Sequence, residues 1–213
     1  MPAFLQTLDP ALQLIVLMAA LSLLPFVIVS MTSFLRYIIV LSILKTALGT
    51  QQVPPSMVLV GIALVLTCYT MAPVFGEMYE KISPDMKKGA NMVTLLVDGS
   101  EPLKEFMMRQ TRQDDIAFFL QMTRNKMPES PKELTIWEVA PAFMISELRT
   151  SFEIGFIIFI PFIVLDLVVA NILLALGMFM LSPTIISLPF KILVFVAVDG
   201  WSLVINGLVK SFN

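Results

Sequence analysis

Long runs without a charged residue are the feature that most limits how this chain of 213 residues can fold. Three such runs cover residues 10–35, 46–76 and 167–190, and a shorter one covers 154–165. A helix that crosses a lipid bilayer needs about 20 mainly apolar residues, and a charge inside it is costly. The chain is 57% hydrophobic and 14% charged, against about 45–50% and 25% in soluble domains. It therefore belongs to the membrane class.

The uncharged runs predict an all-α membrane protein built on about four hydrophobic helices. We expect these helices at about residues 11–31, 56–75, 154–181 and 184–209. Prolines interrupt or bound each of them: Pro25, Pro54, Pro55, Pro73, Pro161, Pro183 and Pro189. Proline removes a helix hydrogen bond, and at membrane depth the freed carbonyl needs a protein or water partner. We therefore expect broken helices that form hairpins in a packed assembly, rather than four straight rods.

Charge divides the chain into three regions, because 23 of its 30 charged residues lie between Glu77 and Glu153. We expect N-terminal hydrophobic helices over residues 1–76, a central polar helical region over 77–150 and a C-terminal hydrophobic hairpin over 151–213. Short loops with Lys or Arg tend to stay on the cytoplasmic side. Arg36 and Lys45 lie in the link between the first two hydrophobic helices, and the link between the last two leads into Lys191. Placing both links inside puts the central region outside.

Short helices are also predicted in the central region. The SPKE sequence at residues 130–133 matches a capping box, and Ser100 shortly before a proline marks a second helix start. Leu103, Phe106 and Met107 recur at the spacing of one helix face, which predicts a buried stripe.

The residue types present exclude several classes of function. There is no histidine and only one cysteine, Cys68, so the chain has neither an internal disulfide nor the usual zinc ligands. The Ser-His and Cys-His nucleophile pairs are missing, as are glycine-rich phosphate loops. A net charge of −2 gives no reason to expect nucleic acid, which is bound by clustered Lys and Arg. We expect no enzyme activity, no cofactor and no metal.

Eight charged residues in or beside the hydrophobic helices are candidate polar contacts between helices or subunits. They are Arg36, Lys45, Glu147, Arg149, Glu153, Asp166, Lys191 and Asp199. A charge at bilayer depth costs at least about 2.5–3.5 kcal/mol, so it pairs or faces water. Asp166 has no opposite charge near it in sequence and needs a partner from elsewhere in the fold, another subunit or water. Because acids and bases occur at similar depths, structural pairing explains them more economically than an ion pathway.

The segment LALGMFMLSP, residues 174–183, closes the third uncharged run with an unusual composition. Gly177 permits a joint in the chain, Met178 and Met180 flank Phe179, and Pro183 leads into the last hydrophobic helix. Methionine is unbranched and adaptable, so it fills gaps in ordinary cores and also suits a surface that closes around varied partners. From spacing alone, the commoner role is packing against lipid or protein.

Three stretches carry a resemblance to a known family. The first is TSFLRYIIVLSILKTALGTQQVPPSMVLVGIALVLTCYTMAP, residues 32–73. The second is SELRTSFEIGFIIFIPFIVLDLVVANILLALGMFMLSPTIISLPFKILVFVAVDGW, residues 146–201, and the third is the central PLKEFMMRQTR, residues 102–112. All three resemble the FliP/SctR family, the export-gate subunits of bacterial type III secretion systems. The resemblance covers nearly the whole chain.

The resemblance implies a pore-forming subunit that lines and gates a channel for unfolded export substrates. Family members assemble as several copies, by our expectation five, with FliQ/SctS-like and FliR/SctT-like subunits into a helical cone. FlhB/SctU-like and FlhA/SctV-like export components are the further partners implied. The cone lies at the bacterial inner membrane, with much of it on the periplasmic side. A separate ATPase and the proton-motive force supply the energy, in agreement with the absence of nucleotide motifs here.

The family's methionine-rich loop closes the pore, and residues 178–180 match it here, with Gly177 and Pro183 as the hinge. Phe179 interrupts the methionine run that is frequent in the family, and Ser56 stands where asparagine is common. Flagellar members usually carry a cleaved signal peptide. No basic residue precedes the first uncharged run, which we therefore interpret as retained structure. Both flagellar and injectisome (virulence) systems stay open.

Two other functions are compatible with the residues themselves. A small multipass transporter would use broken helices to form a substrate site near the bilayer midplane, and it would work without FliQ- and FliR-like partners. A membrane-anchored scaffold would bind its partner through the central polar region. In that case unrelated hydrophobic helices would replace its anchors without loss of activity.

Overall fold

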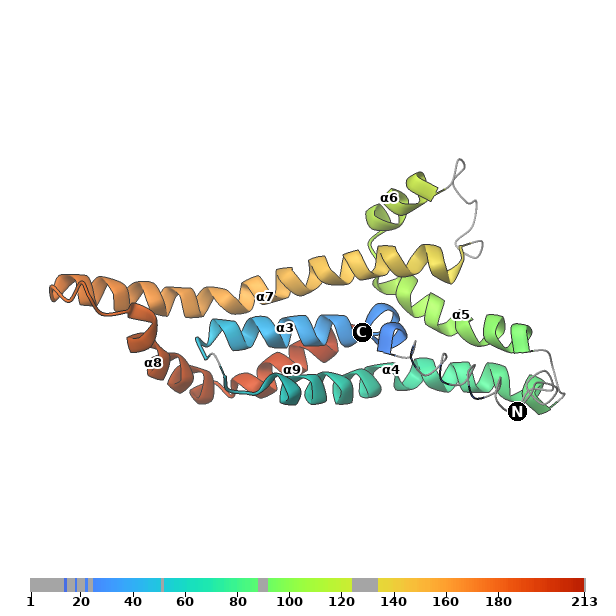
Figure 1. Cartoon of the computed structure of the whole chain (residues 1–213), viewed down its shortest axis with the longest axis horizontal. Coiled ribbons are helices and arrows are strands. Elements are labelled where there is room, and N and C mark those ends of the chain that lie inside the picture. The colour runs from blue at the N-terminus through green and yellow to red at the C-terminus, as the bar shows by residue number, and fades with distance from the viewer. Residues whose placement is uncertain are drawn as a thin grey trace. The chain divides into compact units, whose positions relative to one another are not determined.

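The computed structural model describes residues 25–50, 52–87, 92–123 and 134–212, together with Leu14, Met18 and Ser22. Within these ranges every regular element is a helix and no strand occurs, which confirms the predicted all-α class (Figure 1). The helices are α3 (Phe34–Ala47), α4 (Ser56–Lys87), α5 (Met92–Gln110), α6 (Gln113–Thr123), α7 (Ile136–Ala175), α8 (Pro183–Ala197) and α9 (Gly200–Lys210). A further helical segment, Pro25–Met31, precedes α3.

Two of these helices are long and apolar enough to cross a membrane. The candidate spans are Ser56–Pro84 in α4, with 29 residues, and Ile136–Ala175, which is the whole of α7, with 40 residues. Two pairs of shorter helices meet the same criterion only together: the segment Pro25–Met31 with α3, and α8 with α9, whose axes differ by 64°. The described residues therefore hold two to four candidate spans, and the chain is a helical membrane protein with broken helices.

The breaks inside these two pairs do not lie at prolines. Pro73 and Pro161 are accommodated within α4 and α7. Before α3, the Thr32 hydroxyl donates to the carbonyl of Ile28, a local bond that competes with the helix ladder. Between α8 and α9, Asp199 adopts a left-handed conformation with φ 50°, which ends a right-handed helix. The first break therefore lies at a side-chain hydrogen bond and the second at a left-handed backbone, and neither lies at a proline.

Several helix boundaries differ from those predicted. Helix α4 extends beyond residue 75 to Lys87, α7 begins at Ile136 rather than at 154, and the helix expected at 184–209 is the pair α8 and α9. The hydrophobic helix expected to reach residue 181 ends at Ala175. The helix start predicted at Ser100 is wrong, because α5 begins at Met92 and continues through that residue. An ideal Cβ on Gly99 would lie only 2.4 Å from Cδ1 of Ile82, so close packing on α4 overrides the local start signal. The predicted capping box at residues 130–133 and most of the first hydrophobic helix lie outside the described residues.

By the contacts between helices the chain forms two compact units. Unit 1 comprises Met1–Leu35 and Cys68–Glu147, and unit 2 comprises Arg36–Thr67 and Leu148–Asn213. Helices α4 and α7 contribute residues to both. This division follows packing, whereas the division into residues 1–76, 77–150 and 151–213 follows polarity and stays a prediction.

Unit 1 is held together by the apolar face of α5. Leu103, Phe106 and Met107 are all buried, which confirms the predicted stripe. The ring of Phe106 meets that of Phe143 in α7 edge-on, with centroids 6.0 Å apart. Next to this contact, the backbone N–H of Arg112 donates to the Ser146 hydroxyl over 3.1 Å. These contacts fix α5 and the start of α6 on the first turns of α7.

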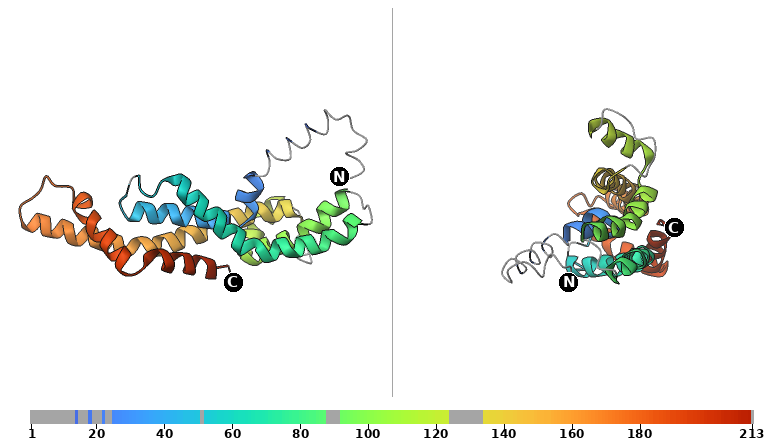
Figure 2. Two further views of the ribbon diagram at one scale, coloured as in Figure 1. Left: turned by 90° about the horizontal axis from the view of Figure 1, so that it is seen from below. Right: turned by 90° about the vertical axis from the view of Figure 1, so that its right-hand side faces the viewer.

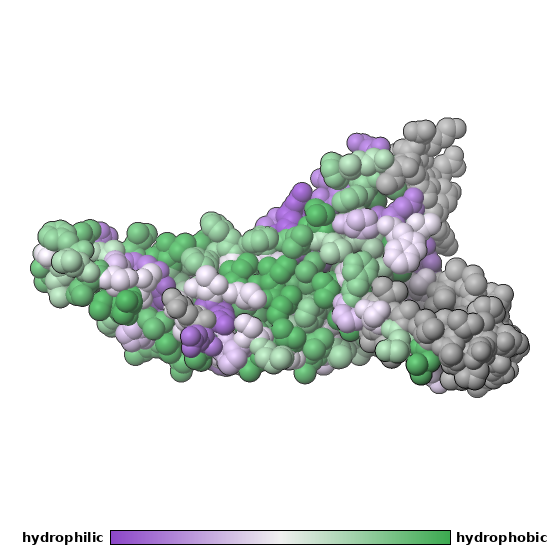
Figure 3. Space-filling view, viewed as in Figure 1, coloured by the Kyte–Doolittle hydropathy of each residue, from purple (hydrophilic) through white to green (hydrophobic). Residues whose placement is uncertain are grey.

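Unit 2 contains α3, the first part of α4, the C-terminal part of α7, α8 and α9 (Figures 1 and 2). Gly155 lets α3 approach α7 closely, because an ideal Cβ there would lie 2.4 Å from Cδ1 of Ile43. Phe195 of α8 packs against Phe162 of α7 and, edge-on, against Trp201 of α9. Figure 3 shows that much of the remaining surface of this unit is apolar. Unit 2 also carries the hairpin α7–α8 and the segment predicted to act as a gate.

Candidate gate loop and the polar cluster behind it

The connection between α7 and α8 begins with a glycine turn that ends α7. Gly177 has φ 72°, its N–H donates to the carbonyl of Leu174 over 3.1 Å, and the N–H of Met178 donates to that of Leu173 over 2.9 Å. This pair of bonds is the Schellman motif, in which a glycine in left-handed conformation satisfies the last carbonyls of a helix. The helix therefore stops at Ala175, although the apolar run continues.

The residues after the turn form the exposed tip of the α7–α8 hairpin. The exposed fraction is 44% for Met178, 75% for Phe179 and 100% for Met180. Leu176 and Leu181, on either side, are exposed as well. Unit 2 does not bury this group of five apolar side chains, hereafter the apolar tip, in its own core.

Helix α8 starts at Pro183, directly after the tip. Ser182 is the N-cap residue in extended conformation, Pro183 occupies the first helical turn, and no side chain caps the helix start. Proline suits this position because its missing N–H would have no partner there. The hydroxyls of Ser182 and Thr184 share a hydrogen bond of 2.8 Å. The tip is thus bounded by a glycine turn on one side and a proline start on the other.

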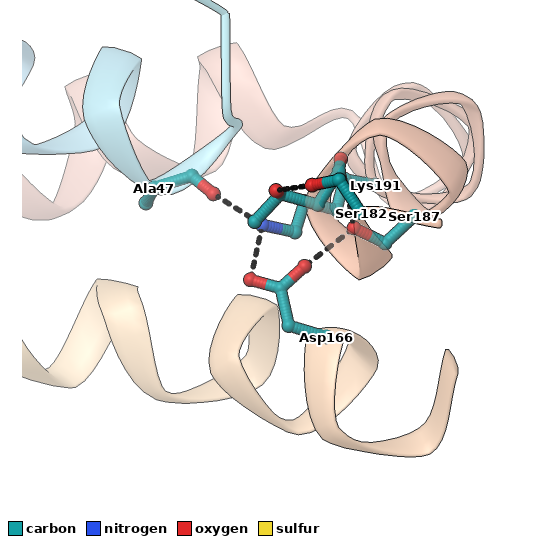
Figure 4. A network of polar contacts seen from close by, with 6 residues as sticks. Ala47, Asp166, Ser182, Ser187 and Lys191 are labelled. Atoms are coloured by element: carbon teal, nitrogen blue, oxygen red, sulfur yellow. Dashed lines mark hydrogen bonds and ion pairs between the residues drawn. The ribbon is translucent and has the colours of Figure 1, made fainter. Parts of the chain in front are cut away.

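Behind the tip, a polar cluster joins three helices of unit 2 (Figure 4). The Lys191 Nζ lies 2.7 Å from Oδ2 of Asp166 and donates to the carbonyl of Ala47 over 3.2 Å. The Ser187 hydroxyl donates to the other carboxylate oxygen of Asp166. Side-chain exposure is 4% for Lys191 and 26% for Asp166. The cluster fixes α8 against α7 and against the end of α3.

The chemistry of this cluster follows from helix geometry. Ser187 and Lys191 are four residues apart and therefore share one face of α8. Ala47 is the last residue of α3, where carbonyls have no partner within the helix and carry a partial negative charge. Lys191 thus neutralises a carboxylate and satisfies a helix end at once.

At the other end of unit 2, Arg36 also binds the free backbone carbonyl at a helix end. Its Nη1 donates to the carbonyl of Ser211 over 2.8 Å and to its hydroxyl over 2.9 Å. Ser211 is the C-cap of α9. The guanidinium carbon lies 3.7 Å from the centroid of the Phe212 ring, and Tyr37 packs on that ring. Arg36, which is only 2% exposed, therefore holds the end of α9 against the start of α3.

The remaining predicted polar residues are spread over both units. Glu147 is fully buried in α7, Arg149 and Glu153 line a shallow cavity beside α3, Lys45 lines a second cavity and Asp199 is exposed at the α8–α9 break. Of the eight, the structure brings Asp166 and Lys191 together as an ion pair. Sequence reasoning missed Ser187 and the two helix-end carbonyls, although the four-residue spacing of Ser187 and Lys191 is a usable signal.

The left-handed glycine gives a prediction for the stability of the hairpin. Gly177→Ala is expected to lower the free energy of unfolding by about 1–2 kcal/mol, because left-handed backbone strains any residue with a Cβ. No atom lies within 4 Å of that Cβ, so the cost comes from the backbone alone. Gly207→Ala is a matched control, since it also has open space but lies inside α9, where alanine should stabilise by about 0.5–1 kcal/mol. Thermal unfolding of both purified variants in detergent measures the difference, and equal shifts would contradict the role of the turn.

Broken spans, an exposed apolar tip and a buried ion pair between helices define a multispan helical membrane protein with internal polar contacts. The chain belongs to the FliP family, whose sequence model matches residues 17–208, and this confirms the resemblance seen in its sequence. The flagellar biosynthetic protein FliP of Bacillus subtilis (strain 168) is 45% identical over 208 residues, 97% of this chain and 94% of that protein. The FliP of Caulobacter vibrioides is 47% identical over 206 residues, 96% of this chain and 77% of that protein. The pathogenicity-related ORF2 of Xanthomonas campestris pv. glycines is 41% identical over 216 residues, 98% of this chain and all of that protein.

Proposed function

We propose that this chain is a non-enzymatic subunit of a bacterial type III export apparatus and that it lines and gates the channel for unfolded proteins. The observation that carries the gating role is the apolar tip, Leu176 and Met178–Leu181, exposed at the end of a hairpin. Similarity to flagellar biosynthetic proteins over nearly the whole chain supports the export role.

A ring of apolar tips explains how such a gate closes. The tip carries no charge and no polar side chain before Ser182, so several copies around an axis form a hydrophobic constriction that excludes water and ions. Methionine adapts its shape through three rotatable bonds, so the same ring can fit around varied peptide segments. One chain supplies only one tip, and the gate therefore requires assembly.

The proposed assembly contains several copies of this chain, five by our expectation, with FliQ/SctS-like and FliR/SctT-like subunits. FlhB/SctU-like and FlhA/SctV-like components complete the apparatus at the bacterial inner membrane, with much of the cone on the periplasmic side. The exposed apolar face of α7 in unit 2 supports a packed assembly, because it is wide enough to contact lipid or neighbouring subunits. Its exposed residues include Phe152, Phe156, Ile157, Ile160, Val164 and Leu167.

A crosslinking experiment tests whether substrates pass the tip. In the test cells, a chain with Met180→Cys and Cys68→Ser replaces the native subunit. The exported substrate carries one cysteine and a folded domain, and the folded domain stalls the substrate in the channel. Met180 is fully exposed and Cys68 is the free cysteine, so we expect a disulfide between the stalled substrate and residue 180.

The matched control places the cysteine at exposed Ile157 on α7, again with Cys68→Ser, and should give no adduct. Adducts of equal yield at both positions, or none at residue 180 while export continues, would contradict the proposed gate.

A further inference from the structure

A second candidate site lies in a cavity of unit 2 that the proposed gate does not use. The cavity has a volume of about 810 Å³ and lies between the last turn of α3, the connection from α3 to α4 and the first turns of α8. Figure 3 shows hydrophilic side chains gathered around the turn between α3 and α4, in a surface of this unit that is otherwise mostly apolar. Polar groups at this place need an explanation.

One wall of the cavity offers hydrogen-bond acceptors. The Thr46 hydroxyl donates to the carbonyl of Ser42 over 3.0 Å, and the Thr50 hydroxyl donates to that of Lys45 over 3.3 Å. Gly49, with φ 76°, turns the chain between them. Both threonines line the cavity, and because each hydroxyl has already used its one hydrogen, it has only acceptor lone pairs left for a ligand. This wall suits a ligand that carries hydroxyl groups.

Other residues of the cavity supply donors and a positive charge. The Lys45 ammonium carries three N–H donors, and no ion pair or hydrogen bond joins it to another residue in the described part of the chain. The Gln52 amide adds two more donors. Thr184 also lines the cavity, and its hydrogen bond with Ser182 uses only one of the two hydroxyl hydrogens. No Asp or Glu lines the cavity, so its chemistry suits an anion that also has hydroxyl groups.

The cavity also has an apolar side and lies where candidate spans end. Val53, Ile185 and Leu188 line it, and the first two are about 70% exposed. The connection before α4 joins the ends of two candidate spans, and the tip before α8 joins the ends of two more. Ends of spans lie at the depth of lipid headgroups. Lys45 lies in the last turn of α3, directly before this short connection, and a lysine there favours the cytoplasmic leaflet, which is negatively charged.

We propose that this cavity binds an anionic phospholipid whose headgroup carries hydroxyl groups, of the phosphatidylglycerol type. The phosphate lies beside Lys45 and Gln52, and the glycerol hydroxyls donate to Thr46 and Thr50. An acyl chain follows Ile185 and Leu188. A zwitterionic lipid fits less well, because its ammonium group would lie next to Lys45 without a carboxylate to balance it.

Native mass spectrometry tests this proposal. The complex is purified in detergent and titrated with phosphatidylglycerol or phosphatidylethanolamine, and the number of bound lipid molecules is counted. The native protein should bind phosphatidylglycerol preferentially. Lys45→Gln should weaken that binding about fivefold, the effect of one lysine near an anionic surface, and Lys45→Arg should keep it. Lys210→Gln is the matched control, since Lys210 is an exposed lysine at the end of α9 and does not line the cavity. Thr50→Val should weaken binding of phosphatidylglycerol but not of phosphatidic acid, whose headgroup has no glycerol hydroxyl.

Three results would overturn the proposal. One is equal binding of both lipids by the native protein, and another is a Lys45→Gln variant that binds phosphatidylglycerol as the native protein does. The third is a ligand of another kind. It would be seen if glycerol 3-phosphate in solution displaced the lipid completely, or if an acidic protein bound through Lys45 and no lipid was retained. None of these readouts measures export, so a negative result leaves the proposed gate untouched.

Discussion

Replacing Met178, Phe179 and Met180 together with alanine is expected to open a leak across the membrane of cells that make the complete complex. Alanine removes most of the apolar volume of the tip, and a wider constriction no longer excludes water by its hydrophobicity. We expect small-molecule and ion permeability to rise on the order of tenfold or more, because rates depend exponentially on the barrier. Uptake of a small chromogenic substrate, measured in cells before any export begins, checks this.

Two control variants separate loss of the seal from general damage. Met57, Val58 and Val65 are exposed on α4, away from the tip and from the apolar face of α7, and replacing these three with alanine should leave permeability unchanged. Phe179→Met alone should also keep the seal, since methionine fills a similar space with a more flexible chain. An intact barrier in the triple tip variant, with the complex present at normal amounts, would count decisively against a gate at residues 178–180.

Features that follow from local chemistry could be predicted from the sequence. The uncharged runs gave the all-α membrane class, the start of α4 after Pro55 and the start of α8 at Pro183. The apolar stripe of α5 was also predictable, because its members recur at helical spacing. The sequence predicts a flexible hinge at Gly177, whereas the hydrogen bonds around this residue form a defined C-terminal cap of α7.

The partners of the buried cations could not be predicted in the same way. The sequence predicts polar contacts for Arg36 and Lys191, and the structure adds backbone acceptors to them: Arg36 binds the carbonyl of Ser211, and Lys191 binds that of Ala47 as well as its carboxylate. Every residue has a backbone carbonyl, so no residue type marks the helix end that will accept a cation. Only the packing of α3 against α8 and α9 decides which carbonyls are available.

The positions of the helix breaks were missed for a related reason. Proline was the expected cause, but Pro73 and Pro161 lie inside long helices, where neighbouring groups can satisfy the freed carbonyls. The observed break at Asp199 uses a residue type that is several-fold enriched in left-handed backbone, although few aspartates adopt it. Such a preference does not single out one aspartate from a sequence, and it becomes decisive only when α8 and α9 pack at 64° to each other.

The ion pair behind the tip gives the second large effect. Asp166→Ala is expected to lower the free energy of unfolding by about 3 kcal/mol, the lower end of the range for breaking a buried pair, because Asp166 itself is partly exposed. The loss arises from Lys191, which stays buried without its counter-charge. Lys191→Met should cost less, since the Asp166 carboxylate keeps the Ser187 hydroxyl and can reach water. The double variant Asp166→Ala, Lys191→Met should recover much of the loss, because it leaves no buried charge without a partner. Chemical unfolding in detergent gives all three values, and simple additivity of the single effects would show that the two residues do not act as a pair.

The same variants show whether the pair also positions the tip for assembly. Asp166→Ala should still insert into the membrane, because removing a charge from an apolar helix favours insertion. Its hairpin is no longer fixed by Lys191 and Ser187, so native gels should show much less of the multimer while membrane extraction recovers normal amounts of the chain. Asp199→Asn is the matched control, since Asp199 is exposed and asparagine tolerates its left-handed backbone. The double variant distinguishes the two roles of the pair: if it restores stability but not assembly, the charges orient the hairpin as well as stabilise it. Normal multimers in Asp166→Ala would restrict the pair to stability alone.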